Sequence, residues 1–221
     1  MLARVLSAAV NGVDAYPIEV EVNSGFGESL VVIVGLPDAA VKESRDRVTT
    51  AMSNSGFKFP LGRTTINLAP ADVRKEGPSF DLPIAVAMLA ASEQFETDQL
   101  DNFAMIGELA LTGAVRSVKG ALAIALQARA EGRTGLLVPP ENAAEAAVVQ
   151  GINVIPVENL REAVSFLEGE IRLAPTKVNL DNIFDQPLEE DIDFSEVKGQ
   201  ESVKRALEIA AAGGHNVIML C

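Results

Sequence analysis

The chain has 221 residues, of which 48% are hydrophobic and 22% charged, so it can bury a substantial core and is not disordered throughout. It holds no apolar run long enough to cross a membrane, and no signal peptide is predicted. One cysteine, Cys221, and one histidine, His215, exclude an internal disulfide, a cysteine cage and a multi-histidine site, so we predict no metal site. The net charge of −13 argues against a basic nucleic-acid-binding surface over the whole molecule.

The charge is unevenly distributed along the chain. Between Lys42 and Lys75 there are seven basic and three acidic residues, a net charge of +4. Between Asp185 and Glu196 there are six acidic residues and no basic one. Each cluster is compatible with an ordinary solvated surface, and the basic one also with local contacts to phosphates.

The first 35 residues are typical of β-strands. Residues 16–22 alternate between apolar and polar side chains, and residues 29–34 form a β-branched run. An amphipathic helix follows, with Asp38 as its N-cap and Gly56 as its C-terminal stop. Its polar side carries Lys42, Arg45 and Arg47.

Strands and helices alternate after residue 60, which predicts an α/β core with parallel pairing. The expected strands are residues 62–69, 104–111, 135–138 and 152–157. The expected helices are residues 81–92, 118–131, 140–149 and 159–168. Because the start of the chain is rich in strands, we expect a mixed sheet rather than a purely doubly wound one.

Residues 170–194 lack a sustained period and contain prolines and the acidic cluster, which is typical of a linker. A helix over residues 200–212 and a strand over residues 216–221 are predicted beyond it. One helix and one strand cannot close a core, so we expect this second unit to be incomplete, as though the chain ended where a parallel sheet begins.

Two loops hold candidate functional residues. In the loop KEGPSFD, residues 75–81, Ser79 stands where it could cap the following helix. A serine at a helix N-terminus can also act as a nucleophile, but only if a base activates it. Arg116 and Lys119 precede a later helix, where they are either phosphate contacts or ordinary loop charges.

Four segments together resemble the ComM/YifB type of magnesium-chelatase-like AAA+ ATPases. They are residues 1–23, VGLPDAAVKESRDRV at 34–48, INLAPADVRKEGPSFDLPIAVAML at 66–89 and DFSEVKGQESVKRALEIAAAGGHNVIML at 193–220. In that family a Walker A phosphate loop follows the last segment directly, whereas this sequence stops at Cys221. The resemblance implies an N-terminal domain over residues 1–169, an acidic linker over 170–194 and the start of an AAA+ module over 195–221. We therefore expect no ATPase activity and no bound cofactor for these residues by themselves.

The family's N-terminal domain is similar in fold to the proteolytic domain of Lon, a ribosomal-protein-S5-domain-2-like α/β fold with a Ser-Lys dyad. The resemblance places Ser79 at the nucleophile position and Leu122 at the lysine position. With the general base absent from that position, the resemblance implies a non-proteolytic domain and no catalytic residue.

Members of the family are understood as hexameric, ATP-driven motors on DNA that act in natural transformation and recombination. The resemblance implies a cytoplasmic protein whose N-terminal domain serves ring assembly and engages single-stranded or branched DNA. In such a ring, six copies of a modest basic patch would sum even though each chain is acidic. The candidate DNA contacts are Arg45, Arg47, Arg63, Arg74, Lys75 and Lys119.

The full-length protein is expected to use ATP and Mg²⁺, with part of the adenine pocket formed by Val197, Lys198, Gly199 and Gln200. Two other functions stay open. One is a Lon-like serine hydrolase in which Ser79 would be activated by Lys119 or Lys75. The other is a magnesium-chelatase subunit, against which the presence of a whole Lon-like domain argues.

Overall fold

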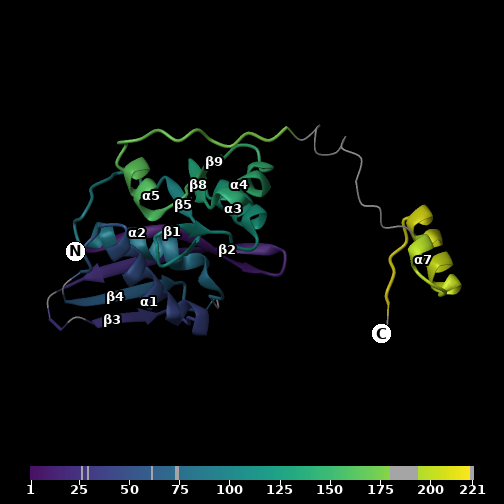
Figure 1. The fold of residues 1–221 in the computed structure, drawn as a ribbon, viewed down its shortest axis with the longest axis horizontal. Helices are drawn as coiled ribbons and strands as arrows, with labels where there is room; N and C mark the ends of the chain where they lie inside the picture. The colour runs from purple at the N-terminus through teal and green to yellow at the C-terminus, as the bar shows by residue number, and fades with distance from the viewer. Residues whose placement is uncertain (26, 29, 61, 73–74, 180–193, 220–221) are drawn as a thin grey trace. The chain divides into compact units, whose positions relative to one another are not determined.

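The computed structural model describes residues 1–221 apart from 26, 29, 61, 73–74, 180–193 and 220–221 (Figure 1). The chain divides into two compact units, Met1–Val178 and Asn179–Cys221. Within the described residues, no helix has the length and apolar character needed to cross a membrane.

A seven-stranded sheet forms the centre of the first unit, in the order β3-β4-β2-β1-β5-β8-β9. Its strands are β1 (Leu2–Asn11), β2 (Asp14–Ser24), β3 (Leu30–Val34), β4 (Arg63–Ala69), β5 (Phe103–Met105), β8 (Gly135–Val138) and β9 (Asn153–Pro156). β2 is antiparallel to both of its neighbours, β1 and β4, whereas the other described strand pairs of this seven-stranded sheet are parallel. The predicted mixed α/β class is therefore confirmed.

Helices pack on both faces of this sheet (Figure 1). Because successive strand residues point to opposite faces, Phe103 and Met105 of β5 join one core cluster and Ala104 joins the other. The first cluster contains residues of α1 (Ala39–Asn54), α2 (Asp81–Ala91) and α5 (Leu160–Leu167). The second contains residues of α3 (Ala121–Ala130) and α4 (Pro140–Ala147). α2 is buried along almost its whole length, so it forms the centre of the larger core.

The strand expected over residues 104–111 is divided in the structure. β5 ends at Met105, and Glu108–Leu109 forms a separate short strand, β6, which pairs with β7 (Val115–Arg116). Gly107 lies at the break, and its backbone bonds to the chain around Ser79 instead of continuing the ladder. This departure from the sheet positions the loop that precedes α2.

The first unit extends beyond the boundary predicted at residue 169. After α5 the chain continues along the same unit: the Thr176 backbone N–H donates to the Val154 carbonyl at 2.8 Å, and Leu173 packs against the core. These contacts keep the segment through Val178 with the first unit, and the rest of the expected linker lies largely outside the described residues.

The second unit contains a short 3-10 helix, η2 (Phe194–Glu196), and α7 (Glu201–Gly213), which matches the predicted helix closely. The strand predicted for residues 216–221 is wrong over its described part, because residues 216–219 form no strand. A strand is stabilised by pairing, and the described residues of this unit contain no other strand with which it could pair.

Candidate functional site

The loop that carries Ser79 is fixed from two sides. On one side, the Asp38 carboxylate accepts hydrogen bonds from the Val41 N–H at 2.8 Å and the Gly77 N–H at 3.1 Å. Asp38 is thus the predicted N-cap of α1 and also the attachment of the loop to that helix. On the other side, the Gly107 N–H donates to the Ser79 carbonyl at 3.0 Å.

Ser79 does not cap the helix that follows it, so that prediction is wrong. It lies within a 3-10 turn, η1 (Pro78–Phe80), and α2 begins at Asp81 with Phe80 as N-cap and no side-chain cap. The polar group that the N-terminus of α2 holds instead is the Asp81 carboxylate, in its first turn.

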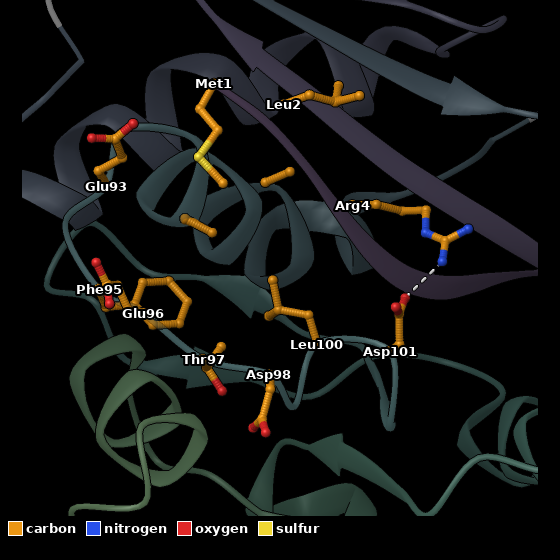
Figure 2. Close-up of a pocket in the computed structure, with 12 residues that line it drawn as sticks. Met1, Leu2, Arg4, Glu93, Phe95, Glu96, Thr97, Asp98, Leu100 and Asp101 are labelled. Carbon is orange, nitrogen blue, oxygen red and sulfur yellow. Dashed lines mark hydrogen bonds and ion pairs between the residues drawn. The ribbon is translucent and has the colours of Figure 1, made fainter.

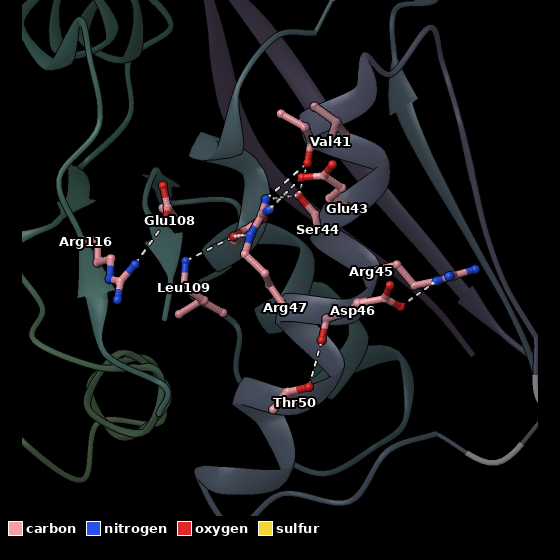
Figure 3. A network of polar contacts seen from close by, with 12 residues as sticks. Val41, Glu43, Ser44, Arg45, Asp46, Arg47, Thr50, Glu108, Leu109 and Arg116 are labelled. Carbon is pink, nitrogen blue, oxygen red and sulfur yellow. Dashed lines mark hydrogen bonds and ion pairs between the residues drawn. The ribbon is translucent and has the colours of Figure 1, made fainter. Parts of the chain in front are cut away.

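Asp81 and Arg47 form the main polar pair of the site. Figure 3 labels Arg47 together with its neighbours Ser44 and Leu109. Arg47 Nε lies 2.8 Å from Asp81 Oδ2, and Arg47 Nη2 lies 3.1 Å from Asp81 Oδ1, so the contact is bidentate. The Leu109 N–H also donates to Asp81 Oδ2, at 3.1 Å. Arg47 Nη2 further donates to Ala40 O and Ser44 Oγ, both at 3.1 Å. One buried carboxylate therefore links α1, α2 and β6.

The pKa values of both side chains in this pair differ from their ordinary values. Burial raises the pKa of the Asp81 carboxyl above its ordinary value, while the hydrogen bonds from Arg47 and from the Leu109 N–H oppose that rise. The hydrogen bond to Asp81 raises the pKa of the Arg47 guanidinium. We take the carboxylate as ionised, because it accepts three N–H bonds and faces a permanent cation.

Lys75 is the second unusual group of this loop. Its side chain is fully buried, and Nζ donates to the Pro70 carbonyl. Burial lowers the pKa of the Lys75 ammonium, and the nearby Asp72 opposes that shift. Its amine is thus directed to a backbone oxygen, and no described hydrogen bond joins it to Ser79.

The position that the resemblance assigns to a catalytic lysine holds an alkyl side chain. Leu122 lies in the first turn of α3, is 40% exposed, and donates its backbone N–H to Glu145 Oε1 at 3.0 Å. The Ser79 hydroxyl makes no hydrogen bond within the described residues. A serine hydroxyl needs a base within hydrogen-bond reach to become a nucleophile, and none of the described hydrogen bonds brings one to Ser79.

The described residues among the six predicted DNA contacts differ in their surroundings. Arg47 and Lys75 have the interior partners described above, and Arg74 lies outside the described residues. Arg45 is exposed on α1 and pairs with its neighbour Asp46 at 3.0 Å. Arg63 is exposed at the start of β4, on the sheet face opposite the buried Thr64, Ile66 and Leu68 that face α1 and α2. Lys119 is exposed in the loop before α3.

The predicted adenine-pocket residues lie in the second unit, immediately before α7. Val197, Lys198, Gly199 and Gln200 are all exposed. Gly199 and Gln200 both have positive φ, +70° and +57°, and the Gln200 carbonyl accepts the Val203 and Lys204 N–H groups at 3.0 Å. These four residues therefore form an exposed segment that leads into α7.

Asp81 was not predicted from the sequence as a functional residue. The available signal was an isolated acid at the start of an almost wholly apolar helix. Such a helix is buried, and a buried carboxylate requires a partner. The position of that partner, Arg47, could not be inferred because it lies on another helix.

The fold and the serine loop define a class of protein, the Lon-like α/β domains. The Lon protease of Endomicrobium trichonymphae is 28% identical over 160 residues, which cover 67% of this chain and 20% of that protein. The family description "Subunit ChlI of Mg-chelatase" matches residues 18–142, and "Magnesium chelatase, subunit ChlI" matches residues 193–221.

The chain belongs to the ComM/YifB-type, magnesium-chelatase-like AAA+ family. It is 45% identical over 219 residues to "Uncharacterized protein YifB" of Escherichia coli, covering 99% of this chain and 42% of that protein. It is 41% identical over 220 residues to "Competence protein ComM" of Haemophilus influenzae, covering 99% and 43% respectively. The chain thus spans about two fifths of the length of these relatives.

Proposed function

We propose that the first unit is a non-proteolytic assembly and DNA-engagement domain of an AAA+ motor. The observation that carries the proposal is the combination of a rigidly held Ser79 loop with Leu122 at the lysine position, in a chain that aligns throughout with ComM and YifB. The loop keeps its hydrogen bonds to Asp38 and Gly107, while no described hydrogen bond joins a base to its serine hydroxyl. We infer that the fold is retained as a scaffold.

DNA engagement would use the exposed cations. Of the six candidates, Arg45, Arg63 and Lys119 are described and exposed, whereas Arg47 and Lys75 already bind interior groups. Because these are only three cations in an acidic chain, a single copy is expected to bind weakly, and a ring would present the same cations several times. Phosphate contacts of this kind weaken as salt rises.

Fluorescence anisotropy with single-stranded and forked DNA, over a salt series, tests this proposal. The charge-reversal variant Arg45→Glu/Arg63→Glu/Lys119→Glu should lose binding and flatten the salt slope. A control with the same charge change at other exposed or partly exposed cations is Arg129→Glu/Arg172→Glu/Lys177→Glu. Equal binding by both variants, with both folded by circular dichroism, would refute DNA contact through this domain.

For the full-length, cytoplasmic protein we propose a hexamer that hydrolyses ATP with Mg²⁺ and moves branched DNA. The segment Val197–Gln200 would then line the adenine once the remaining module is present. Sedimentation of the full-length protein with and without ATP tests assembly, and displacement of a labelled strand from a forked duplex tests the motor.

A chelatase role is the second candidate, because both matching family descriptions name a magnesium-chelatase subunit. The relatives that match over 99% of the chain are named ComM and YifB, and neither name mentions a chelatase, so we place this candidate second. ATP-dependent insertion of magnesium into a porphyrin by the full-length protein would support a chelatase function.

A further inference from the structure

Two adjoining hollows lie at one end of the first unit. The first, about 590 Å³, lies between Met1–Arg4 and the segment from Glu93 to Asp101 (Figure 2). The second, about 530 Å³, lies between the same segment and the residues that end α5. Glu96, Thr97 and Asp98 line both hollows, so together they form one groove, called here the 93–101 groove.

This groove is separate from the Ser79 loop. α2 begins beside the loop at Asp81 and ends beside the groove, where Ala90 and Glu93 line the first hollow. Eleven helical residues span about 16 Å at 1.5 Å per residue, so the two sites lie at opposite ends of one buried helix. The groove therefore needs an explanation of its own.

The floor of the groove is apolar and partly open to solvent. Met1 is 67% exposed and Leu2 62% exposed, and both line the first hollow together with Phe95 and Leu100. Figure 2 shows Leu100 near the middle of the view and Met1 and Leu2 above it, with charged side chains around them. Apolar side chains gathered in a concave surface and rimmed by polar ones are typical of a docking site.

The rim is acidic. Glu93, Glu96, Asp98 and Asp101 line the first hollow, and Arg4 is its one basic lining residue among those described. Arg4 is already paired, at 2.8 Å with Asp101 and at 3.5 Å with Glu19. Among the described ion pairs, none neutralises Glu93, Glu96 or Asp98, and all three are exposed. The exposed Arg172 lines the second hollow, and the Met1 ammonium donates to the Ser24 carbonyl at 2.8 Å, so both add positive charge. Glu168 also lines the second hollow, and the acidic lining residues of the groove still outnumber its cations. The rim thus keeps a net negative charge.

The backbone adds to this negative potential, because two helices end at the groove. Ala90 near the C-terminus of α2 lines the first hollow, and Phe166 and Leu167 at the end of α5 line the second. The carbonyl end of a helix carries a partial negative charge that favours cations. Thr97 Oγ1 donates to the Leu167 carbonyl at 2.6 Å, which fixes the segment to the end of α5.

We propose that the 93–101 groove docks a basic segment of a partner protein. Apolar side chains of that segment would cover Met1, Leu2 and Leu100, and its lysines or arginines would face Glu93, Glu96 and Asp98. Nucleic acid is disfavoured here because phosphates would meet this acidic rim. A resident metal is disfavoured because the described residues hold no group of three or more carboxylate, histidine or cysteine ligands with metal-site geometry.

Fluorescence anisotropy of the whole chain with a labelled peptide of alternating lysine and leucine tests the proposal. Binding is expected for this peptide, but not for peptides with glutamate in place of lysine or serine in place of leucine. The variant Glu96→Gln/Asp98→Asn should weaken binding about threefold to tenfold, as the loss of two exposed charge pairs predicts. Leu2→Ser should also weaken it.

A matched control is Asp14→Asn/Glu141→Gln, which removes the same charge at exposed positions outside the groove. Unchanged binding in this control, with weakened binding in the groove variants, supports the proposal. Equal loss in both double variants, or displacement of the peptide by spermine as readily as by unlabelled peptide, would mean general charge attraction and would overturn it. Absence of peptide binding by the folded chain would overturn it as well.

Discussion

Arg47 and Asp81 lie 34 residues apart in sequence, yet Arg47 Nε approaches Asp81 Oδ2 to 2.8 Å in the interior between α1 and α2. The carboxylate is fully buried and the arginine side chain is 22% exposed. The pair joins the helix that Asp38 caps to the helix that the Ser79 loop precedes. It therefore holds the two helices that define the candidate site in fixed relation.

Replacing Arg47 with alanine should destabilise the first unit by about 3–5 kcal/mol, because the buried Asp81 carboxylate would lose its counterion. The double variant Arg47→Met/Asp81→Leu should recover much of that loss, since no uncompensated charge is left. Urea unfolding followed by circular dichroism measures both. Arg45→Ala on the exposed side of the same helix is the control, expected within about 0.5 kcal/mol of wild type. A small effect of Arg47→Ala would show that the pair is dispensable.

Lys75 should make stability depend on pH. Because burial lowers the pKa of Lys75 in the folded chain, the unfolded chain binds more protons between that lowered pKa and the ordinary value of 10.5. The free energy of unfolding of the wild type should therefore rise, relative to that of Lys75→Met, as pH increases through this window. Urea unfolding of both proteins across alkaline pH checks the difference. A difference that does not vary with pH would contradict the assignment.

Asp38 should matter more to stability than Ser79. Asp38→Ala removes the cap of α1 and the bond to Gly77, and the loss of such a cap costs about 0.5–2 kcal/mol. Ser79→Ala removes no described hydrogen bond and should stay within about 0.5 kcal/mol of wild type. Thermal unfolding of the two variants compares them. The reverse order would restore a structural role for the serine hydroxyl.

Ser79 should also be unreactive. A fluorophosphonate probe is expected to label wild type and Ser79→Ala equally, because no described base contacts the hydroxyl. Intact-protein mass spectrometry measures the labelling. Selective labelling of the wild type at Ser79 would instead support the hydrolase alternative.

Gly35 should tolerate no side chain. It has φ +98°, and a Cβ there would collide with the Leu68 backbone carbonyl. Gly35→Ala should therefore cost more than about 1 kcal/mol, since alanine can neither adopt the angle without strain nor fit. Gly12→Ala separates the two effects, because Gly12 has φ +65° but open space around it. Thermal unfolding measures the loss of stability in each variant. Equal losses would mean that backbone strain, and not the collision with the Leu68 carbonyl of β4, causes the destabilisation.

The sequence by itself determined most elements of the first unit. Asp38 at the start of α1, the all-apolar run of α2 and the short β-branched strands are local signals, and local signals predict local structure. The mixed sheet and the family followed from the same residues and their order. The replacement of the expected lysine by Leu122 could also be read directly from the sequence.

Only the tertiary structure decided how the charged residues are used. The basic residues between Lys42 and Lys75 belong to one stretch of sequence, but they have different surroundings in the folded chain. Arg47 binds Asp81, Lys75 binds the Pro70 carbonyl, and Arg63 lies on the opposite face of the sheet from α1. The 93–101 groove likewise brings Met1 and Leu2 together with Glu96 and the end of α5. Which charges are neutralised and which remain for a partner depends on contacts between distant segments, and no local pattern records those contacts.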